Sequence, residues 1–139
     1  MAVINGEELI LGRLASIVSE RLLKGESIQI VNAQKLVITG SKTDVLKRFE
    51  TKINLRVKGN PEKGPKMSRR TDLFVKRSIR GMLPYKSKSG KDAMKRLRVF
   101  TGIPKNLAAI KAENIEKIKH KGSKKFLYVE EISKLLGAQ

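Results

Sequence analysis

The stretch AVINGEELILGRLASIVSERLLKGESIQIV, residues 2–31, carries the pattern that decides the fold. Its ends, Ala2–Ile4 and Ser27–Val31, are short apolar runs, and the second is rich in β-branched residues, as buried strands are. Between them, apolar residues recur at spacings of three and four: Leu11, Leu14, Ala15, Val18 and Leu22. Gly25 follows this series in the position expected just past a helix C-terminus. The stretch therefore predicts strand, helix and strand, the unit of an α/β protein.

A further strand and a second helix are predicted next along the chain. Leu36–Thr39 is a short apolar run closed by Gly40. After it, four apolar residues repeat at every fourth position, as on one face of a helix: Val45, Phe49, Ile53 and Val57. The opposite face of that helix is basic, with Lys47, Arg48, Lys52 and Lys58.

The most informative predicted helix covers residues 69–83. At about 100° per residue, one side of it is apolar, with Phe74, Val75, Ile79, Met82 and Leu83. The other side gathers cations: Arg69, Arg70, Lys76, Arg77 and Arg80. Asp72 and Leu73 break this division. Solubility alone is the alternative role for such a cationic face, but solubilising faces usually mix both signs of charge, so a face that presents cations to an anionic partner is favoured.

Two basic loops flank this helix. Gly59–Ser68 contains two prolines, which interrupt regular structure. Pro84 ends the helix, and Tyr85–Lys91 forms the second loop, whose small residues let a backbone approach phosphates closely. Tyr85 either stacks on an unpaired base or packs within the fold, and packing is favoured. The remaining predicted elements are a short helix, a strand and a C-terminal helix, at Asp92–Leu97, Arg98–Thr101 and Val129–Leu136.

The charge of the chain is unusual for its size. At 139 residues the chain is predicted to form a single domain, residues 1–139. It holds 31 Lys and Arg against 13 Asp and Glu, a net charge of +18. Residues 1–41 are balanced at four of each sign, whereas residues 42–98 hold 19 cations and five acids. So large an excess repels itself unless an anion neutralises it, and its concentration in one region predicts contact with a nucleic acid.

The inventory of reactive groups argues against an enzyme. The chain has no cysteine and one histidine, His120, so a thiol nucleophile and the usual zinc sites are excluded. Gly59 and Gly64 faintly resemble a phosphate-binding loop, but Pro65 stands where that motif needs a lysine. The acids of residues 42–98 are scattered rather than paired. We therefore expect no catalytic residue, no metal site and no cofactor.

Nothing in the sequence predicts export or membrane insertion. The first eleven residues carry two glutamates before any long apolar run, unlike a signal or transit peptide. No run approaches the roughly 18 apolar residues of a membrane span. The absence of cysteine also fits a reducing compartment. We expect a cytoplasmic protein.

The candidate nucleic-acid contacts are the cations of the basic helices and loops. The central set is Arg69, Arg70, Lys76, Arg77, Arg80, Lys86, Lys88, Lys91, Lys95 and Arg96, supported by Lys47, Arg48, Lys52, Lys63 and Lys66. Gly81 and Gly90 are predicted to be structural, Gly81 because another backbone approaches it closely.

Several runs of the sequence together resemble a known family. They are Leu11-Gly12-Arg13-Leu14-Ala15-Ser16, Val31-Asn32-Ala33-Gln34-Lys35 with Thr39-Gly40, Asn60-Pro61 with Gly64-Pro65, Ile79-Arg80-Gly81-Met82-Leu83-Pro84-Tyr85-Lys86, and Val99-Phe100 with Gly102-Ile103-Pro104. The chain is similar to the thirteenth protein of the large ribosomal subunit over nearly its whole length. The fourth run is the specific one. The Gly-Ile-Pro ending and the short C-terminus resemble archaeal members most.

The resemblance implies a fold and a role. The fold is a three-layer α/β/α arrangement around a mainly parallel four-stranded sheet, in a single domain with basic loops. The role is that of a structural constituent of the large ribosomal subunit, which binds large-subunit rRNA and supports assembly. Its partners are that rRNA and neighbouring ribosomal proteins, without a membrane or a small-molecule substrate. The alternative from another class is a free-standing basic nucleic-acid-binding regulator.

Overall fold

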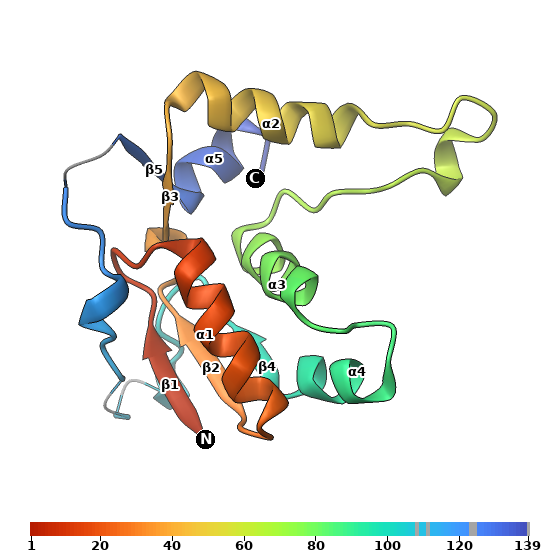
Figure 1. The fold of residues 1–139 in the computed structure, drawn as a ribbon. Coiled ribbons are helices and arrows are strands. Elements are labelled where there is room, and N and C mark those ends of the chain that lie inside the picture. The colour runs from red at the N-terminus through yellow and green to blue at the C-terminus, as the bar shows by residue number, and fades with distance from the viewer. Residues whose placement is uncertain (108, 111, 123–124, 139) are drawn as a thin grey trace.

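The computed structural model of this chain describes residues 1–107, 109–110, 112–122 and 125–138 (Figure 1). Its centre is a parallel sheet in which β2 lies between β1 and β4. The three strands are β1 (Ala2–Asn5), β2 (Ile28–Val31) and β4 (Leu97–Val99). Helix α1 (Leu11–Leu23) connects β1 to β2, because parallel neighbours need a long crossover rather than a hairpin. The predicted strand, helix and strand are confirmed.

Helix α1 contains the apolar series from which we predicted it. All five residues of that series are buried. The helix ends at Leu23, and Gly25 follows with φ +99°, a left-handed conformation that glycine adopts without a steric cost. The periodicity therefore predicted both the helix and the face that it buries.

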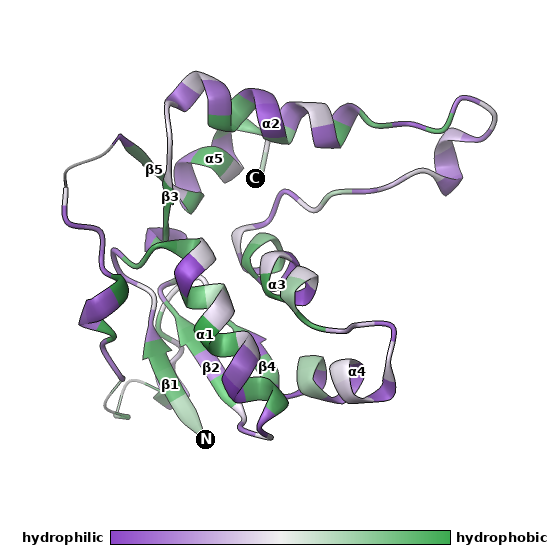
Figure 2. Ribbon diagram, viewed as in Figure 1, coloured by the Kyte–Doolittle hydropathy of each residue, from purple (hydrophilic) through white to green (hydrophobic). Residues whose placement is uncertain are grey.

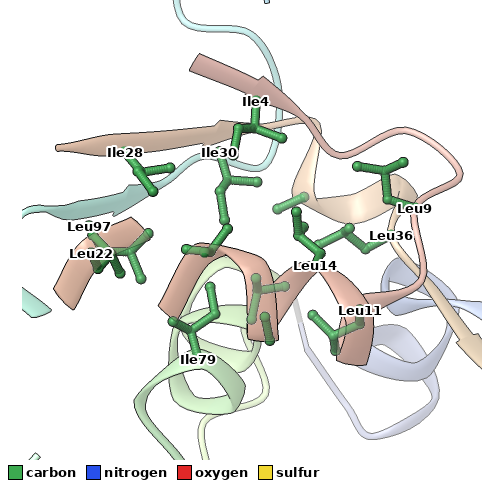
Figure 3. Packing of buried hydrophobic residues seen from close by; sticks show 14 of the residues in the cluster. Ile4, Leu9, Leu11, Leu14, Leu22, Ile28, Ile30, Leu36, Ile79 and Leu97 are labelled. Carbon is green, nitrogen blue, oxygen red and sulfur yellow. The ribbon is translucent and has the colours of Figure 1, made fainter. Parts of the chain in front are cut away.

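The main core lies between the sheet and three helices on one of its faces. Helix α1 packs against α3 (Thr71–Met82) and α4 (Lys88–Lys95), and α3 also packs against β4. Figure 3 shows Leu14, Leu22 and Ile79 from the helices turned toward strand residues such as Ile28 and Ile30. All five are fully buried, and each such side chain contributes about 1.5–3 kcal/mol of burial free energy.

The other face of the sheet has a thinner cover. Val3 and Val31 pack there against Leu107 and Phe100. In the described residues between β4 and β5 (Phe126–Tyr128), the helical elements are single 3-10 turns, Lys105–Leu107 and Glu116–Ile118. This face is thus covered by irregular chain rather than by the second helical layer that the family resemblance implies.

The α/β class is confirmed, while the sheet differs in detail from the expected four strands. The described residues form three parallel strands and a separate antiparallel pair, β3 (Val37–Thr39) with β5 (Phe126–Tyr128). Between β2 and β3 the chain turns at Asn32, with φ 55°, and at the 3-10 turn Ala33–Lys35. This turn directs β3 away from the edge of the parallel sheet, and Val37 of β3 instead forms an isolated parallel bridge with Ile10, in the segment between β1 and α1.

A second apolar cluster holds α2 (Lys42–Asn54) against the C-terminal helix α5 (Val129–Leu135). The cluster consists of Val45, Leu127, Ile132 and Leu136. Ser41 caps α2, since its hydroxyl accepts a hydrogen bond from the amide of Asp44. The predicted extension of α2 to Val57 is wrong: the helix ends at Asn54, and Val57 is exposed.

Three other boundaries differ from prediction. Helix α3 begins at Thr71, so Arg69 and Arg70 precede it. Helix α4 begins at Lys88 rather than Asp92, because Ser87 caps it by accepting from the amide of Gly90. The second half of the predicted loop Tyr85–Lys91 is therefore helical. Strand β4 begins one residue earlier than predicted and is shorter, and strand β5 was not predicted.

Candidate nucleic-acid interface

A basic arm, residues 55–70, extends from the end of α2 and returns to the start of α3 (Figure 1). The prolines predicted to interrupt regular structure do so, and the arm contains only the 3-10 turn Pro61–Lys63. Figure 2 shows hydrophilic residues at its far end and along α2. Its cations are exposed: Arg56, Lys58, Lys63, Lys66, Arg69 and Arg70.

Helix α2 presents three of the predicted cations beside this arm. Lys47, Arg48 and Lys52 are exposed, while Val45 on the apolar face is buried in the second cluster. The ammonium group of Lys52 lies 5.4 Å from the centre of the Phe49 ring. The amphipathic pattern thus places the cations of α2 outward and fixes their spacing along a rigid helix.

Helix α3 presents its two faces as predicted at most positions. Phe74, Val75 and Ile79 are buried, whereas Arg77 and Arg80 are exposed. Lys76, also on the predicted cationic face, is partly buried. Met82, the last residue of the helix, was predicted on the apolar side but is 46% exposed.

The cations next to α3 have individual contacts. Arg77 donates a hydrogen bond to the carbonyl oxygen of Lys66, which ties the basic arm to the helix. Arg70 forms an ion pair with Asp72 at 2.9 Å. The carbonyl of Arg69 accepts a hydrogen bond from the Ser133 hydroxyl, so α5 also holds the returning end of the arm.

The turn after α3 and helix α4 hold the remaining candidates. Four lysines are exposed, namely Lys86, Lys88, Lys91 and Lys95. Lys95 lies 3.4 Å from Asp92. Arg96 differs from them, since it is partly buried and donates to the carbonyl oxygen of Leu22 at 2.8 Å. That contact gives Arg96 a role in the fold at the C-terminal end of α1.

Tyr85 is exposed but contacts a neighbouring side chain. Its ring is 45% exposed, and the guanidinium of Arg80 lies 5.2 Å from the ring centre. The contact is a cation–π interaction, which contributes about 0.5–1 kcal/mol at an exposed site. It orients Arg80 along the surface between α3 and α4.

The two glycines predicted to be structural differ. A Cβ atom at Gly90 would overlap with the carbonyl oxygen of Pro84, so Gly90 is required by the turn before α4. At Gly81 a Cβ atom would meet no described residue within 4 Å. The predicted close approach of backbone at Gly81 within the fold is therefore wrong.

The basic region, residues 42–98, has few internal counter-charges. In the described part of the chain, its ion pairs are those of Arg70 with Asp72 and of Lys95 with Asp92. The ends of the chain are different, because most of their carboxylates are paired with nearby cations. Glu7, for example, lies 2.6 Å from Lys35, and the hydrogen bond and charge of that lysine lower the pKa of Glu7. Neutralisation of residues 42–98 must come mainly from outside the chain.

The described residues contain no group of three or more His, Asp or Glu placed to hold a metal ion. Within the same ranges, none of the helices has both the length and the apolar character needed to cross a bilayer.

Sequence reasoning missed Arg56 and Lys58 as candidates. The four-residue repeat through Val57 predicted helix there, and the choice of contacts concentrated on the next basic helix. The structure instead puts both residues on the exposed basic arm beside Lys63 and Lys66. The charge excess of residues 42–98 was the signal that includes them.

The comparisons with known proteins agree with this geometry. The family described as ribosomal protein L13 matches residues 1–106. The protein named large ribosomal subunit protein uL13 from Methanocaldococcus jannaschii is 46% identical over all of this chain and 99% of its own. Proteins of the same name from Methanosphaera stadtmanae and Archaeoglobus fulgidus are 41% and 46% identical over 100% and 97% of this chain, and 99% and 86% of theirs. The chain therefore belongs to the ribosomal protein L13 family and is similar to its archaeal members.

Proposed function

We propose that this chain is a structural constituent of the large ribosomal subunit that binds and stabilises large-subunit rRNA and supports subunit assembly. The observation that carries the proposal is the basic surface of α2, the basic arm, α3 and α4, in which most cations lack a carboxylate partner among the described residues. The names of the relatives support the same subunit.

The cations act by neutralising phosphates. Each Lys or Arg that meets a phosphate releases a condensed counterion, and this release supplies much of the affinity. The helices α2, α3 and α4 hold rows of cations at fixed spacing, while the basic arm reaches beyond the body of the protein. Folded RNA is recognised mostly by shape, backbone and 2′-hydroxyl groups, so specificity would come from the match between this surface and one RNA fold.

We assign the contacts to the exposed cations of that surface and to the partly buried Lys76. From the sequence-based set they are Lys47, Arg48, Lys52, Lys63, Lys66, Arg69, Arg70, Lys76, Arg77, Arg80, Lys86, Lys88, Lys91 and Lys95, and the structure leads us to add Arg56 and Lys58. Arg96 receives a smaller part, because its guanidinium already binds the end of α1.

We also infer where the chain works and with which partners. The chain works as one domain in the ribosome of the cytoplasm, next to other ribosomal proteins, without enzymatic activity, a cofactor or a small-molecule substrate. The scattered acids of the basic region and the single histidine support this.

Sedimentation tests the function directly. A tagged form of the chain should co-sediment with large subunits in an extract at moderate salt, and the purified protein should bind large-subunit rRNA more tightly than duplex DNA of equal length. Equal affinity for the DNA together with absence from the subunit fraction would instead indicate a free-standing nucleic-acid-binding regulator.

A further inference from the structure

A groove lies between α2, the returning end of the basic arm and α3. Its lining includes residues from all three segments, with Phe49 from α2, Met67 from the arm and Phe74 from α3. The cavity volume is about 330 Å³, which is at the small end of the range of about 300–1,000 Å³ for sites that hold organic ligands. The groove is thus large enough for a compact planar group.

The floor of the groove is aromatic. The rings of Phe49 and Phe74 are 4.9 Å apart in an edge-to-face arrangement. Phe74 is 3% exposed, so it is fixed in the core, while Phe49 is partly exposed toward solvent. The chain has only six aromatic residues, and two of them meet here beneath an open surface.

The rim of the groove is cationic. Lys52 and Arg77 stand on α2 and α3, and the described residues that line the groove include no Asp or Glu. A different hollow, beside β5 and α5, is lined by four glutamates. The α2–α3 groove therefore complements an anionic partner with an apolar part.

Gly81 opens the groove at the end of α3. A glycine in a helix costs about 1 kcal/mol relative to alanine, yet a Cβ atom at Gly81 would meet no described residue within 4 Å. Neither a steric limit nor a positive φ in this fold requires a glycine there. A missing side chain at the groove edge admits the backbone of a partner instead.

We propose that this groove receives one unpaired nucleotide of the large-subunit rRNA. The base lies against the partly exposed ring of Phe49, the phosphate lies between Lys52 and Arg77, and the sugar passes Gly81. Unpaired bases are commonly bound by stacking on aromatic side chains, and each stacked base contributes measurably to affinity. This inference rests on the proposed rRNA binding and names one specific contact within it.

The first test fills the groove edge without removing a cation. The variant Gly81→Leu should stay folded, as circular dichroism would show, and should lose at least tenfold in affinity for purified large-subunit rRNA. Because only the one phosphate held between Lys52 and Arg77 would be displaced, the slope of log affinity against log salt should fall by no more than about 0.7, the value of one phosphate contact to a single strand. The matched control is Gly12→Leu, at a second helical glycine whose Cβ atom would meet nothing within 4 Å, and its affinity should stay within twofold of the original chain.

A second test does not depend on a bulky substitution. A photo-crosslinking phenylalanine analogue at position 49 should react, in assembled large subunits, with one nucleotide that is unpaired in the rRNA. A cross-link to another protein, or to bases spread over paired regions, would overturn the inference. So would normal affinity of Gly81→Leu. If the unaltered chain itself fails to bind large-subunit rRNA, the proposed function fails too, so the two outcomes are distinguishable.

Discussion

At Gly90 the turn between α3 and α4 leaves no room for a side chain, because a Cβ atom would overlap with the Pro84 carbonyl oxygen. Gly90→Ala should therefore displace backbone and lower the free energy of unfolding by about 1–3 kcal/mol, the usual range for overpacking. Urea denaturation measures the change. The control Gly12→Ala, in open space on α1, should instead gain up to about 1 kcal/mol. Equal midpoints for the two variants would contradict this account of the turn.

Arg96 and Lys95 are adjacent cations with different roles. The Arg96 guanidinium donates to the Leu22 carbonyl at the C-terminal end of α1, where a positive charge also stabilises the helix dipole. We expect Arg96→Ala to lower the free energy of unfolding by about 1.5–3 kcal/mol, as for a hydrogen bond to a charged group. Lys95→Ala, at an exposed position, should stay within about 0.5 kcal/mol. Thermal or urea unfolding of both variants checks the difference, and an unchanged Arg96→Ala would contradict it.

At the scale of the element, one face of α3 packs in the core, and the opposite face carries cations that we propose to bind rRNA. Replacing both Arg77 and Arg80 by Glu should leave the domain folded, since both side chains are exposed, and should weaken binding to large-subunit rRNA sharply. Each lost phosphate contact should remove about 0.7–0.9 from the slope of log affinity against log salt. Circular dichroism and a salt titration measure the two effects.

The opposite face of α3 provides the control. Ile79 is fully buried, so Ile79→Asp would bury an unpaired charge and unfold the domain. If the Arg77 and Arg80 double variant binds RNA normally, α3 is not part of the RNA surface.

Helix α5 is held in place by the residues that it buries, Val129, Ile132 and Ser133. Ile132 is fully buried in the cluster that joins α5 to α2, whereas Leu135 is 51% exposed. Ile132→Ala should cost about 2–5 kcal/mol, the range for a truncated core residue. Leu135→Ala should cost less than about 1 kcal/mol. Denaturation midpoints test this, and similar losses at both positions would show that α5 packs differently.

At the scale of the whole molecule, the uneven charge predicts strongly salt-dependent binding. Residues 1–41 are balanced, and their carboxylates form internal ion pairs, as Glu8 does with Lys119, while residues 42–98 carry most of the excess. With roughly 6–10 phosphate contacts, affinity for large-subunit rRNA should fall on the order of 10³–10⁵-fold between 50 and 200 mM salt. Filter binding across that range measures the slope, and a nearly flat dependence would rule out phosphate neutralisation as the main source of affinity.

Local sequence patterns predicted the helices and strands that interactions between nearby residues determine. The apolar series of α1 and the glycine after it predicted that helix and its buried face. A helix repeats every 3.6 residues, and a terminating glycine lies just past its last turn, so both signals are local. The same reasoning placed Ile79 inside and Arg77 and Arg80 outside. It extended α2 too far, to Val57, because the four-residue repeat continues beyond the last residue that finds a partner to pack on.

The sequence by itself determined the α/β class, the family, the concentration of charge in residues 42–98 and most of the exposed cations. Only the tertiary structure decided the pairing of β3 with β5, the extended course of the basic arm, the role of Arg96 in the fold and the groove between α2 and α3. The reason is physical. Composition and periodicity report on residues within a few turns of one another, whereas Thr39 with Phe126, or Arg96 with Leu22, meet only after distant segments have packed together and found the partners that burial and hydrogen bonding require.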